Sequence, residues 1–169
     1  MPETLIGRRR ALQLTGFAAA GAASGLGTAV LSAKPAAAAP VSFNPITPYR
    51  SVDSRAFGPS GKLASGFFVD WDLWTGINNE PKIPQTAAAV TYNLTATDTE
   101  NFGWLIITPA RQITDVSSIN WTATGATLAN GGSVQLGVSP ETGQGSISLA
   151  CGGPSARTHY IIDITGYYT

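Results

Sequence analysis

The sequence predicts an all-β fold, an antiparallel β-sandwich of jelly-roll-like type with about eight to ten short strands. After Pro40, apolar and polar residues alternate with a period of two, which is the pattern of a strand with one buried face. Clusters rich in Gly, Pro, Asn and Asp separate these runs, and no run combines helical periodicity with capping residues. Short strands joined by such turns are typical of sandwiches and barrels.

Five segments carry the strand signal. The clearest is 87–97, in which one face presents apolar side chains while Thr and Asn occupy the other face. The segment 102–109 is apolar on both faces. The expected inward-facing residues of the alternating segments are Val90, Tyr92, Leu94 and Ala96; Val134, Leu136 and Val138 of 132–138; Ile147, Leu149 and Cys151 of 146–151; and Tyr160, Ile162 and Ile164 of 158–168. We expect these residues to form the core between two sheets.

Residues 1–38 have the organisation of an export signal. Three consecutive arginines at 8–10 precede an uncharged run rich in Ala and Gly, and the Ala-x-Ala at 36–38 suits a signal peptidase, so we expect cleavage after residue 38. The arginines favour the twin-arginine type, in which the protein folds before export, and an ordinary secretory signal is the alternative. Several glycines and the Lys-Pro at 34–35 make the run a poor membrane-spanning helix. We therefore expect a secreted, extracellular protein, free or associated with the cell surface.

The charge and cysteine content restrict the partners. The whole chain has ten basic and ten acidic residues, of which four basic and one acidic residue lie in 1–38, so 39–169 carries 6 − 9 = −3. A negative module does not attract a phosphate backbone, and we expect neither nucleic acid nor, after cleavage, a membrane as partner. Cys151 is the only cysteine and cannot form an internal disulfide, which agrees with folding in a reducing compartment before export.

No set of side chains has the spacing of a catalytic or metal site, so we predict a protein that is not an enzyme and has no cofactor or metal. His159 would lie about 13 Å along a strand from Asp163, at ~3.3 Å per residue. Cys151 falls on an apolar face and is expected to be a buried hydrophobic residue. Asp70 and Asp72 share one strand face, whereas glycosidases need two carboxyl groups on opposite sides of a sugar.

Aromatic residues give a stronger functional signal. Trp71, Asp72, Trp74, Asn78 and Asn79 lie close together in the sequence and combine flat rings with polar side chains. This combination is suited to a sugar, because an exposed ring stacks on a pyranose face while carboxylate or amide groups bind hydroxyls. The alternative is that the tryptophans pack in or beside the core, since aromatics supply much of the buried area of a small sandwich. Trp74, which turn-like residues follow, is the tryptophan that we expect to be exposed.

The segment 50–55 reads Arg-Ser-Val-Asp-Ser-Arg in a chain with few charges. If it is extended, Asp53 and Arg55 point to one side and Arg50 to the other, so Arg50 needs a different partner. Asp163 in the last strand is an available acid, and the forked donors of arginine commonly tie such segments together. We interpret the four residues as a structural clasp, and the alternative is an anion or carboxylate contact with a partner.

Seven stretches occur in a characteristic order: ITPYRSVDSR, GKLASG, IPQTAAAVTYNLTAT, FGWLIITP, SSINW, ANGGSVQLGV and THYIIDITGYYT. Together they resemble an actinobacterial secreted module whose pattern runs from Thr-Pro-x-Arg-x-x-Asp-Thr-Arg to Asp-hydrophobic-x-Gly-Tyr-Tyr, and the match covers 43–169. Ser54 stands where the pattern has Thr, and Cys151 and Gly152 stand where a Tyr-Asn type pair is usual. The resemblance implies a secreted β-sandwich and supplies no catalytic residues.

The expected organisation has three parts: the signal peptide 1–38, an extended lead 39–48 and the sandwich 49–169. Val41, Phe43 and Ile46 of the lead are candidates for docking on the sheet edge of a partner. The predicted function is a non-catalytic interaction, adaptor or structural module of an extracellular or cell-surface assembly, with another secreted or surface protein as partner. The alternative is a carbohydrate-binding, lectin-like module for cell-wall or biomass glycan.

Overall fold

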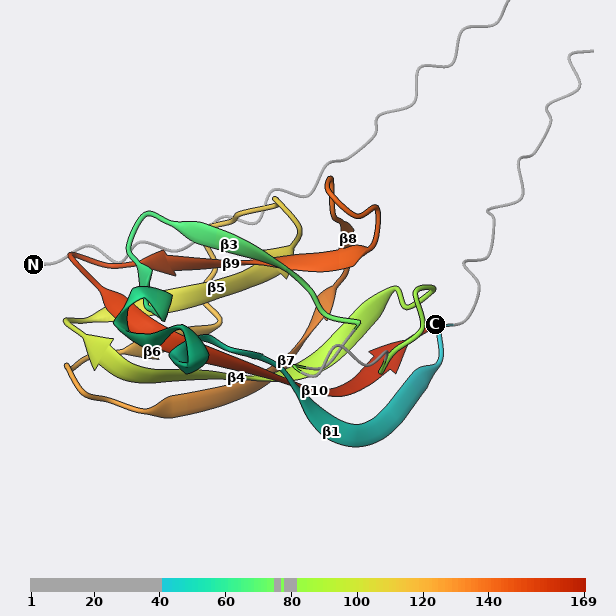
Figure 1. The fold of residues 1–169 in the computed structure, drawn as a ribbon, viewed down its shortest axis with the longest axis horizontal. Coiled ribbons are helices and arrows are strands. Elements are labelled where there is room, and N and C mark those ends of the chain that lie inside the picture. The colour runs from blue at the N-terminus through green and yellow to red at the C-terminus, as the bar shows by residue number, and fades with distance from the viewer. Residues whose placement is uncertain (1–40, 75–76, 78–81) are drawn as a thin grey trace, which may run out of the picture. The chain divides into compact units, whose positions relative to one another are not determined.

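The computed structural model describes residues 41–74, 77 and 82–169, and Figure 1 shows how their elements are arranged. The elements in chain order are β1 (Phe43–Asp53), the 3-10 helix η1 (Ser54–Gly61), β2 (Leu63–Ala64), β3 (Phe68–Asp72), β4 (Ala89–Glu100), β5 (Gly103–Pro109), β6 (Ile119–Trp121), β7 (Leu128–Gln135), β8 (Gly137–Val138), β9 (Gly145–Gly152) and β10 (Arg157–Tyr168). Within these residues no helix is long and apolar enough to cross a membrane. The predicted all-β class is confirmed.

Two antiparallel sheets pack face to face. In the first sheet the strand order is β1-β10-β4-β7, and the short β2 also pairs with β10. In the second sheet the order is β3-β9-β5-β6, and β8 also pairs with β9. The longest ladder joins β10 to β4, from Tyr168 opposite Ala89 to Arg157 opposite Glu100. The prediction of two sheets in a sandwich is thus confirmed, as the two layers of Figure 1 show.

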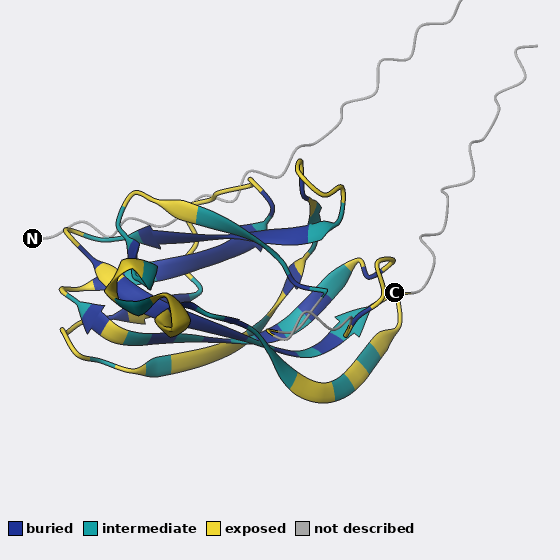
Figure 2. Ribbon diagram, viewed as in Figure 1, coloured by how far each residue is buried: buried dark blue, intermediate teal, exposed yellow. Residues whose placement is uncertain are grey.

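The core lies between the inner faces of the two sheets, where Figure 2 shows the central strands buried. The alternating residues of 87–97, 146–151 and 158–168 all face inward as predicted. The residues expected to face inward in these segments are all buried: Val90, Tyr92, Leu94, Ala96, Ile147, Leu149, Cys151, Tyr160, Ile162 and Ile164. Leu105 and Ile107 of β5 are buried with them. The period-two signal therefore located most of the core correctly.

The segment 132–138 differs from the prediction of one continuous strand. Residues up to Gln135 belong to β7 in the first sheet, and Gly137 and Val138 form β8 in the second sheet. Val134 is buried as expected, whereas Val138 is 73% exposed. The chain passes from one sheet to the other at Leu136, so the alternation that is continuous in the sequence does not correspond to one continuous face.

The start of the sandwich also differs from its expected boundary. Residues 43–48, expected as part of a free lead, form the first half of β1, where Phe43 lies opposite Tyr168 at a ring-centroid distance of 5.2 Å. The N–H of Ser42 donates to the carbonyl of Thr169 at 2.8 Å. Because these backbone groups pair with the last strand, the sandwich begins near Phe43 rather than at Tyr49. This corrects the assignment of Phe43 and Ile46 to a free docking segment.

Two edge strands lie on the same side of the sandwich. β1 is at the edge of the first sheet and β3 at the edge of the second. The segment after β3 crosses to β1, because the Tyr49 hydroxyl donates to the carbonyl of Leu73 at 2.6 Å and the N–H of Ile77 donates to the carbonyl of Arg50 at 3.1 Å. The side between β1 and β3 bears a hollow of about 780 Å³.

Candidate binding site

Trp71 lies at the centre of a groove on the open side of the sandwich, between β1 and β3. Three hollows meet at its side chain, with volumes of about 780, 300 and 250 Å³. The largest and the smallest also share Phe57, and the two larger ones also share Ser51. We call these three adjoining hollows together the Trp71 groove. Its largest hollow has the size of a small-molecule or side-chain pocket.

The largest hollow of the Trp71 groove is mainly apolar. Its walls come from β1, η1 and β3 and consist of Ser51, Val52, Asp53, Arg55, Ala56, Phe57, Trp71 and Ile77. The rings and aliphatic chains at its rim are not covered, since Phe57 is 58% exposed and Ile77 is 62% exposed. Exposed apolar side chains around a concave surface are characteristic of a binding site.

The neighbouring hollow is polar. It is lined by Ser51, Asp70, Trp71, Asp72, Arg111, Ser139, Pro140 and Glu141. Its acids already have protein partners: Arg111 Nε donates to Asp70 Oδ2 at 3.0 Å, and Thr142 Oγ1 donates to Asp72 Oδ2 at 2.9 Å. Asp70 also accepts a hydrogen bond from Ser148. An aromatic ring beside oriented carboxylates can accommodate a sugar hydroxyl as well as a polar peptide group.

All four tryptophans are buried or half-buried. Trp74, expected to be exposed, is instead half-buried and packs against the core. Its carbonyl accepts hydrogen bonds from the backbone N–H groups of Lys82 and Ile83. Trp71 is also half-buried, with its ring centroid 6.4 Å from that of Tyr160. Trp121 is buried in the core. Asn78 and Asn79, also named from the sequence, lie outside the described residues.

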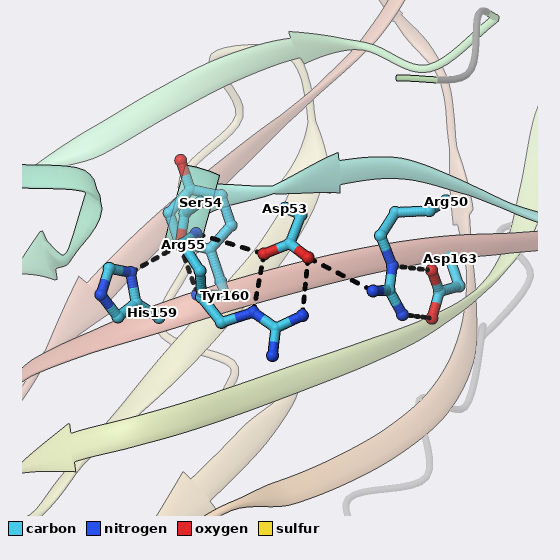
Figure 3. Close-up of polar contacts among 7 residues, drawn as sticks. All are labelled: Arg50, Asp53, Ser54, Arg55, His159, Tyr160 and Asp163. Carbon is cyan, nitrogen blue, oxygen red and sulfur yellow. Dashed lines mark hydrogen bonds and ion pairs between the residues drawn. The ribbon is translucent and has the colours of Figure 1, made fainter. Parts of the chain in front are cut away.

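The structure brings Arg50, Asp53, Arg55 and Asp163 together, as Figure 3 shows. Arg50 donates from Nε to Asp163 Oδ1 at 2.8 Å and from Nη2 to Oδ2 at 3.2 Å. Arg55 donates from Nε and Nη2 to the two oxygens of Asp53 at 2.9 and 2.7 Å. Both are the two-pronged arginine–carboxylate geometry, which is more directional than a single contact.

One detail of this cluster differs from the expectation. Arg50 also reaches Asp53, from Nη1 to Oδ2 at 3.2 Å, so Asp53 binds both arginines. This occurs because the strand ends at Asp53, which caps η1 by accepting the N–H of Arg55 at 3.2 Å. The hydrogen bonds from Arg55 lower the pKa of Asp53 to about 2. The cluster contains two positive and two negative groups that satisfy one another, which favours the clasp over an anion site.

Sequence reasoning missed a second link between the same two segments. Ser54 is fully buried, and its Oγ accepts the N–H of Tyr160 at 2.8 Å and lies 3.1 Å from Nδ1 of His159 (Figure 3). All three polar groups are satisfied when Ser54 donates its hydrogen to an unprotonated Nδ1. A buried serine in this arrangement cannot meet a substrate, so the pair is structural. The only available signal was the position of Ser54 within the Arg-x-x-Asp-Ser-Arg segment.

Further charged groups lie beside His159 on the outside of η1. Lys62 Nζ contacts Asp98 at 2.8 Å and Glu100 at 2.7 Å, so one amine engages both acids at the end of β4. Burial lowers the pKa of His159, with Lys62 adding to the effect.

Cys151 is buried, and its burial raises the pKa of its thiol to about 11, so it is a poor nucleophile at neutral pH.

The described residues contain no group of three or more His, Cys, Asp or Glu side chains that could hold a metal ion. Compared with models of protein families, with curated proteins and with solved structures, the chain finds no match. The resemblance to a secreted actinobacterial module therefore remains a prediction, and the functional conclusion depends on the Trp71 groove.

Proposed function

We propose that the chain is a secreted, non-catalytic binding module that holds another secreted or cell-surface protein in the Trp71 groove. The observation that carries this proposal is the apolar hollow with Phe57 and Ile77 exposed at its rim. A partner that inserts an apolar side chain there would cover surface that is now in water, and each fully buried aliphatic or aromatic side chain contributes about 1.5–3 kcal/mol.

The charges around the hollow support a protein partner over an ionic ligand. Asp53 and Arg55 at the wall are bonded to each other, and Arg50 behind them is bonded to Asp163. An anion or cation entering the hollow would have to compete with two-pronged ion pairs. An apolar side chain would leave these pairs intact, and such a residue at the centre of an interface is a typical binding hot spot.

The test compares two phenylalanines with similar exposure. Phe57 lines the groove, whereas Phe67, which is 67% exposed, does not line any of its three hollows. The wild-type chain should capture a stoichiometric protein from culture supernatant, Phe57→Ala should lose it, and Phe67→Ala should retain it. Equal capture by both variants would refute the groove as the binding site, provided that both have the wild-type unfolding midpoint.

The carbohydrate-binding function remains the second candidate, because the polar hollow places Trp71 beside Asp70, Asp72 and Glu141. Sedimentation with insoluble cell-wall and plant polysaccharides distinguishes the two proposals. Binding to polysaccharide that is lost in Asp72→Ala and kept in Phe57→Ala would favour the glycan. Binding to protein with the opposite dependence would favour the adaptor function.

A further inference from the structure

Besides the two-residue strands β2 and β8, four strands stand at the ends of the two sheets, and three of them carry features that discourage pairing with another strand. β1 contains Pro45, Pro48 and Arg50 and has two irregularities in its register with β10. β3 is five residues long and carries two aspartates, and β6 has only three residues. Prolines, charges, bulges and short length are the usual means by which proteins protect sheet edges. β7 has none of them.

β7, with the sequence LANGGSVQ, is an eight-residue strand without charge or proline, in regular register with β4. Figure 1 shows it as the outermost strand of its layer, and Figure 2 shows this strand largely exposed. The side chains of Ala129, Gly131 and Ser133 are small, and the space where a Cβ of Gly131 would lie is open except for ordinary contact with the Tyr92 carbonyl at 3.6 Å. Small side chains at these positions therefore offer little bulk against a second strand at this edge.

The register identifies which backbone groups are free. Leu136 donates its N–H to the carbonyl of Ala88 at 2.9 Å, and the pairing continues through Val134 opposite Val90 and Gly132 opposite Tyr92. In an antiparallel pair only alternate residues bond to the neighbouring strand. The even-numbered residues of β7 therefore face β4, and the odd-numbered ones point their N–H and C=O away from it: Ala129, Gly131, Ser133 and Gln135.

These four residues have no backbone hydrogen-bond partner in the part of the chain that the structure describes. Asn130, which lies between two of these residues, donates from its side-chain Nδ2 to the carbonyl of Ser118 at 2.8 Å. This bond holds β7 against the second sheet and uses none of the free backbone groups at its edge. The result is a ladder of alternating donors and acceptors along the edge opposite β1.

We propose that β7 of one copy of this chain pairs in antiparallel orientation with β7 of a second copy. The pairing joins the first sheet of one copy to the first sheet of the other across a two-fold axis. A two-fold axis at Gly132 places Gly131 opposite Ser133 and Ala129 opposite Gln135 of the other copy. Each hydrogen-bonded pair exchanges two bonds, so the interface has about eight. The absence of charge on β7 removes the repulsion that self-pairing otherwise produces.

A second copy fits this edge better than an unrelated strand. Gly, Ala and Ser offer no pocket that could select a foreign sequence, and in β-strand addition specificity comes from such pockets. An identical strand presents the same row of free donors and acceptors, and a two-fold axis at Gly132 is the symmetric arrangement that pairs all four outward-facing residues. An interface of one strand pair is smaller than the roughly 1,200–2,000 Å² of a stable complex, so the dimer is weak and forms at high concentration.

The test is sedimentation velocity of the complete chain from about 10 µM to about 1 mM, which brackets a weak dissociation constant. We expect a growing dimer fraction for the wild type and at least about a tenfold weaker association for Ala129→Lys/Ser133→Lys, which places four lysines across the axis. The matched control is Gln112→Lys/Thr114→Lys, which adds the same charge to an exposed loop and should dimerise like the wild type. A monomer at all concentrations, or equal dimerisation of the β7 variant, would overturn the proposal.

Hydrogen exchange keeps the test valid if the lysine variant does not fold. At low concentration, the amides of Ala129, Gly131, Ser133 and Gln135 should exchange fast while those of Asn130 and Gly132 are protected. At high concentration, the first four should become protected and exposed amides of the 110–118 loop should not change. Concentration-independent exchange of the four amides would refute the β7 interface, and it would leave the Trp71 groove unaffected because that surface lies at the opposite edge.

Discussion

The Ser54 hydroxyl lies 3.1 Å from Nδ1 of His159, and the two residues are separated by 105 positions in the sequence. Together with the N–H of Tyr160, they tie the start of η1 to β10. Asp53, the residue directly before Ser54, ends β1 and accepts hydrogen bonds from both arginines of the clasp. Arg50 and Ser54 thus bind Asp163, His159 and Tyr160 of β10 from within five consecutive positions, 50–54.

Ser54→Ala should lower the free energy of unfolding by about 1–3 kcal/mol. The substitution leaves the Tyr160 N–H and the His159 Nδ1 buried without the hydroxyl, and an unsatisfied buried polar group costs this amount. Chemical denaturation measures the effect. Ser60→Ala is the matched control, since Ser60 is an exposed serine of the same helix whose hydroxyl donates to the carbonyl of Phe57. A loss of similar size in both variants would contradict the assigned role of Ser54.

Stability should fall as the pH is lowered through about 6.5, the usual pKa of histidine. Burial lowers the pKa of His159 in the folded state, so below that pH the unfolded chain binds a proton that the folded chain does not. The contribution is fully present above the unfolded pKa and is lost as the pH falls toward the folded one. Unfolding midpoints measured from pH 8 to pH 5 test this, and the pH dependence in this window should disappear in His159→Gln.

Asp53→Ala should lower the free energy of unfolding by about 1–3 kcal/mol, because it removes the partner of Arg55, one partner of Arg50 and the cap of η1. Thermal unfolding measures the loss. The control is Asp115→Ala, an exposed loop carboxylate for which we expect no change. An unchanged midpoint for Asp53→Ala combined with lost partner binding would assign the cluster to recognition instead of to the fold.

The lowered pKa of Asp53 also predicts how the stability of the fold changes in acid. The pKa of Asp53 is lowered to about 2 by the hydrogen bonds from Arg55, so its contribution is present above the usual value near 4 and is lost as the pH falls toward 2. After allowance for solvent screening, this amounts to about 1 kcal/mol. Acid titration of the wild type and of Asp53→Asn should converge at low pH. A constant difference between them down to pH 2 would contradict an ionised Asp53 in the folded state.

Gly103→Ala should be strongly destabilising, by about 2 kcal/mol or more, because a Cβ there would lie 2.5 Å from the Cβ of Ala156 and 2.6 Å from the carbonyl oxygen of Gly152. Gly131→Ala is the matched control in an equally regular strand, with ordinary contact at 3.6 Å. We expect the control to be neutral within about 0.5 kcal/mol, as for a surface position. Equal losses would show that strand propensity, not close packing, determines the effect.

The Trp71 groove illustrates where prediction from the sequence ends. Trp71 and Asp72 were named from their spacing, and both line hollows of the groove. Phe57 was not named, although it is the most exposed ring of the groove, because it stands on η1 and comes to line a hollow with Trp71 only in the folded chain. Contacts between elements far apart in the chain have no local pattern from which they could be predicted.

The sequence by itself determined the fold class, most of the core and the residues of the clasp. Period-two alternation is a property of neighbouring residues, and it identified the inner faces of β4, β9 and β10. The tertiary structure decided which strands became edges, that residues 132–138 divide between two sheets, that Trp74 turns inward, and that Ser54 meets His159. These outcomes depend on the pairing of distant strands, since the same alternating pattern is compatible with many strand orders.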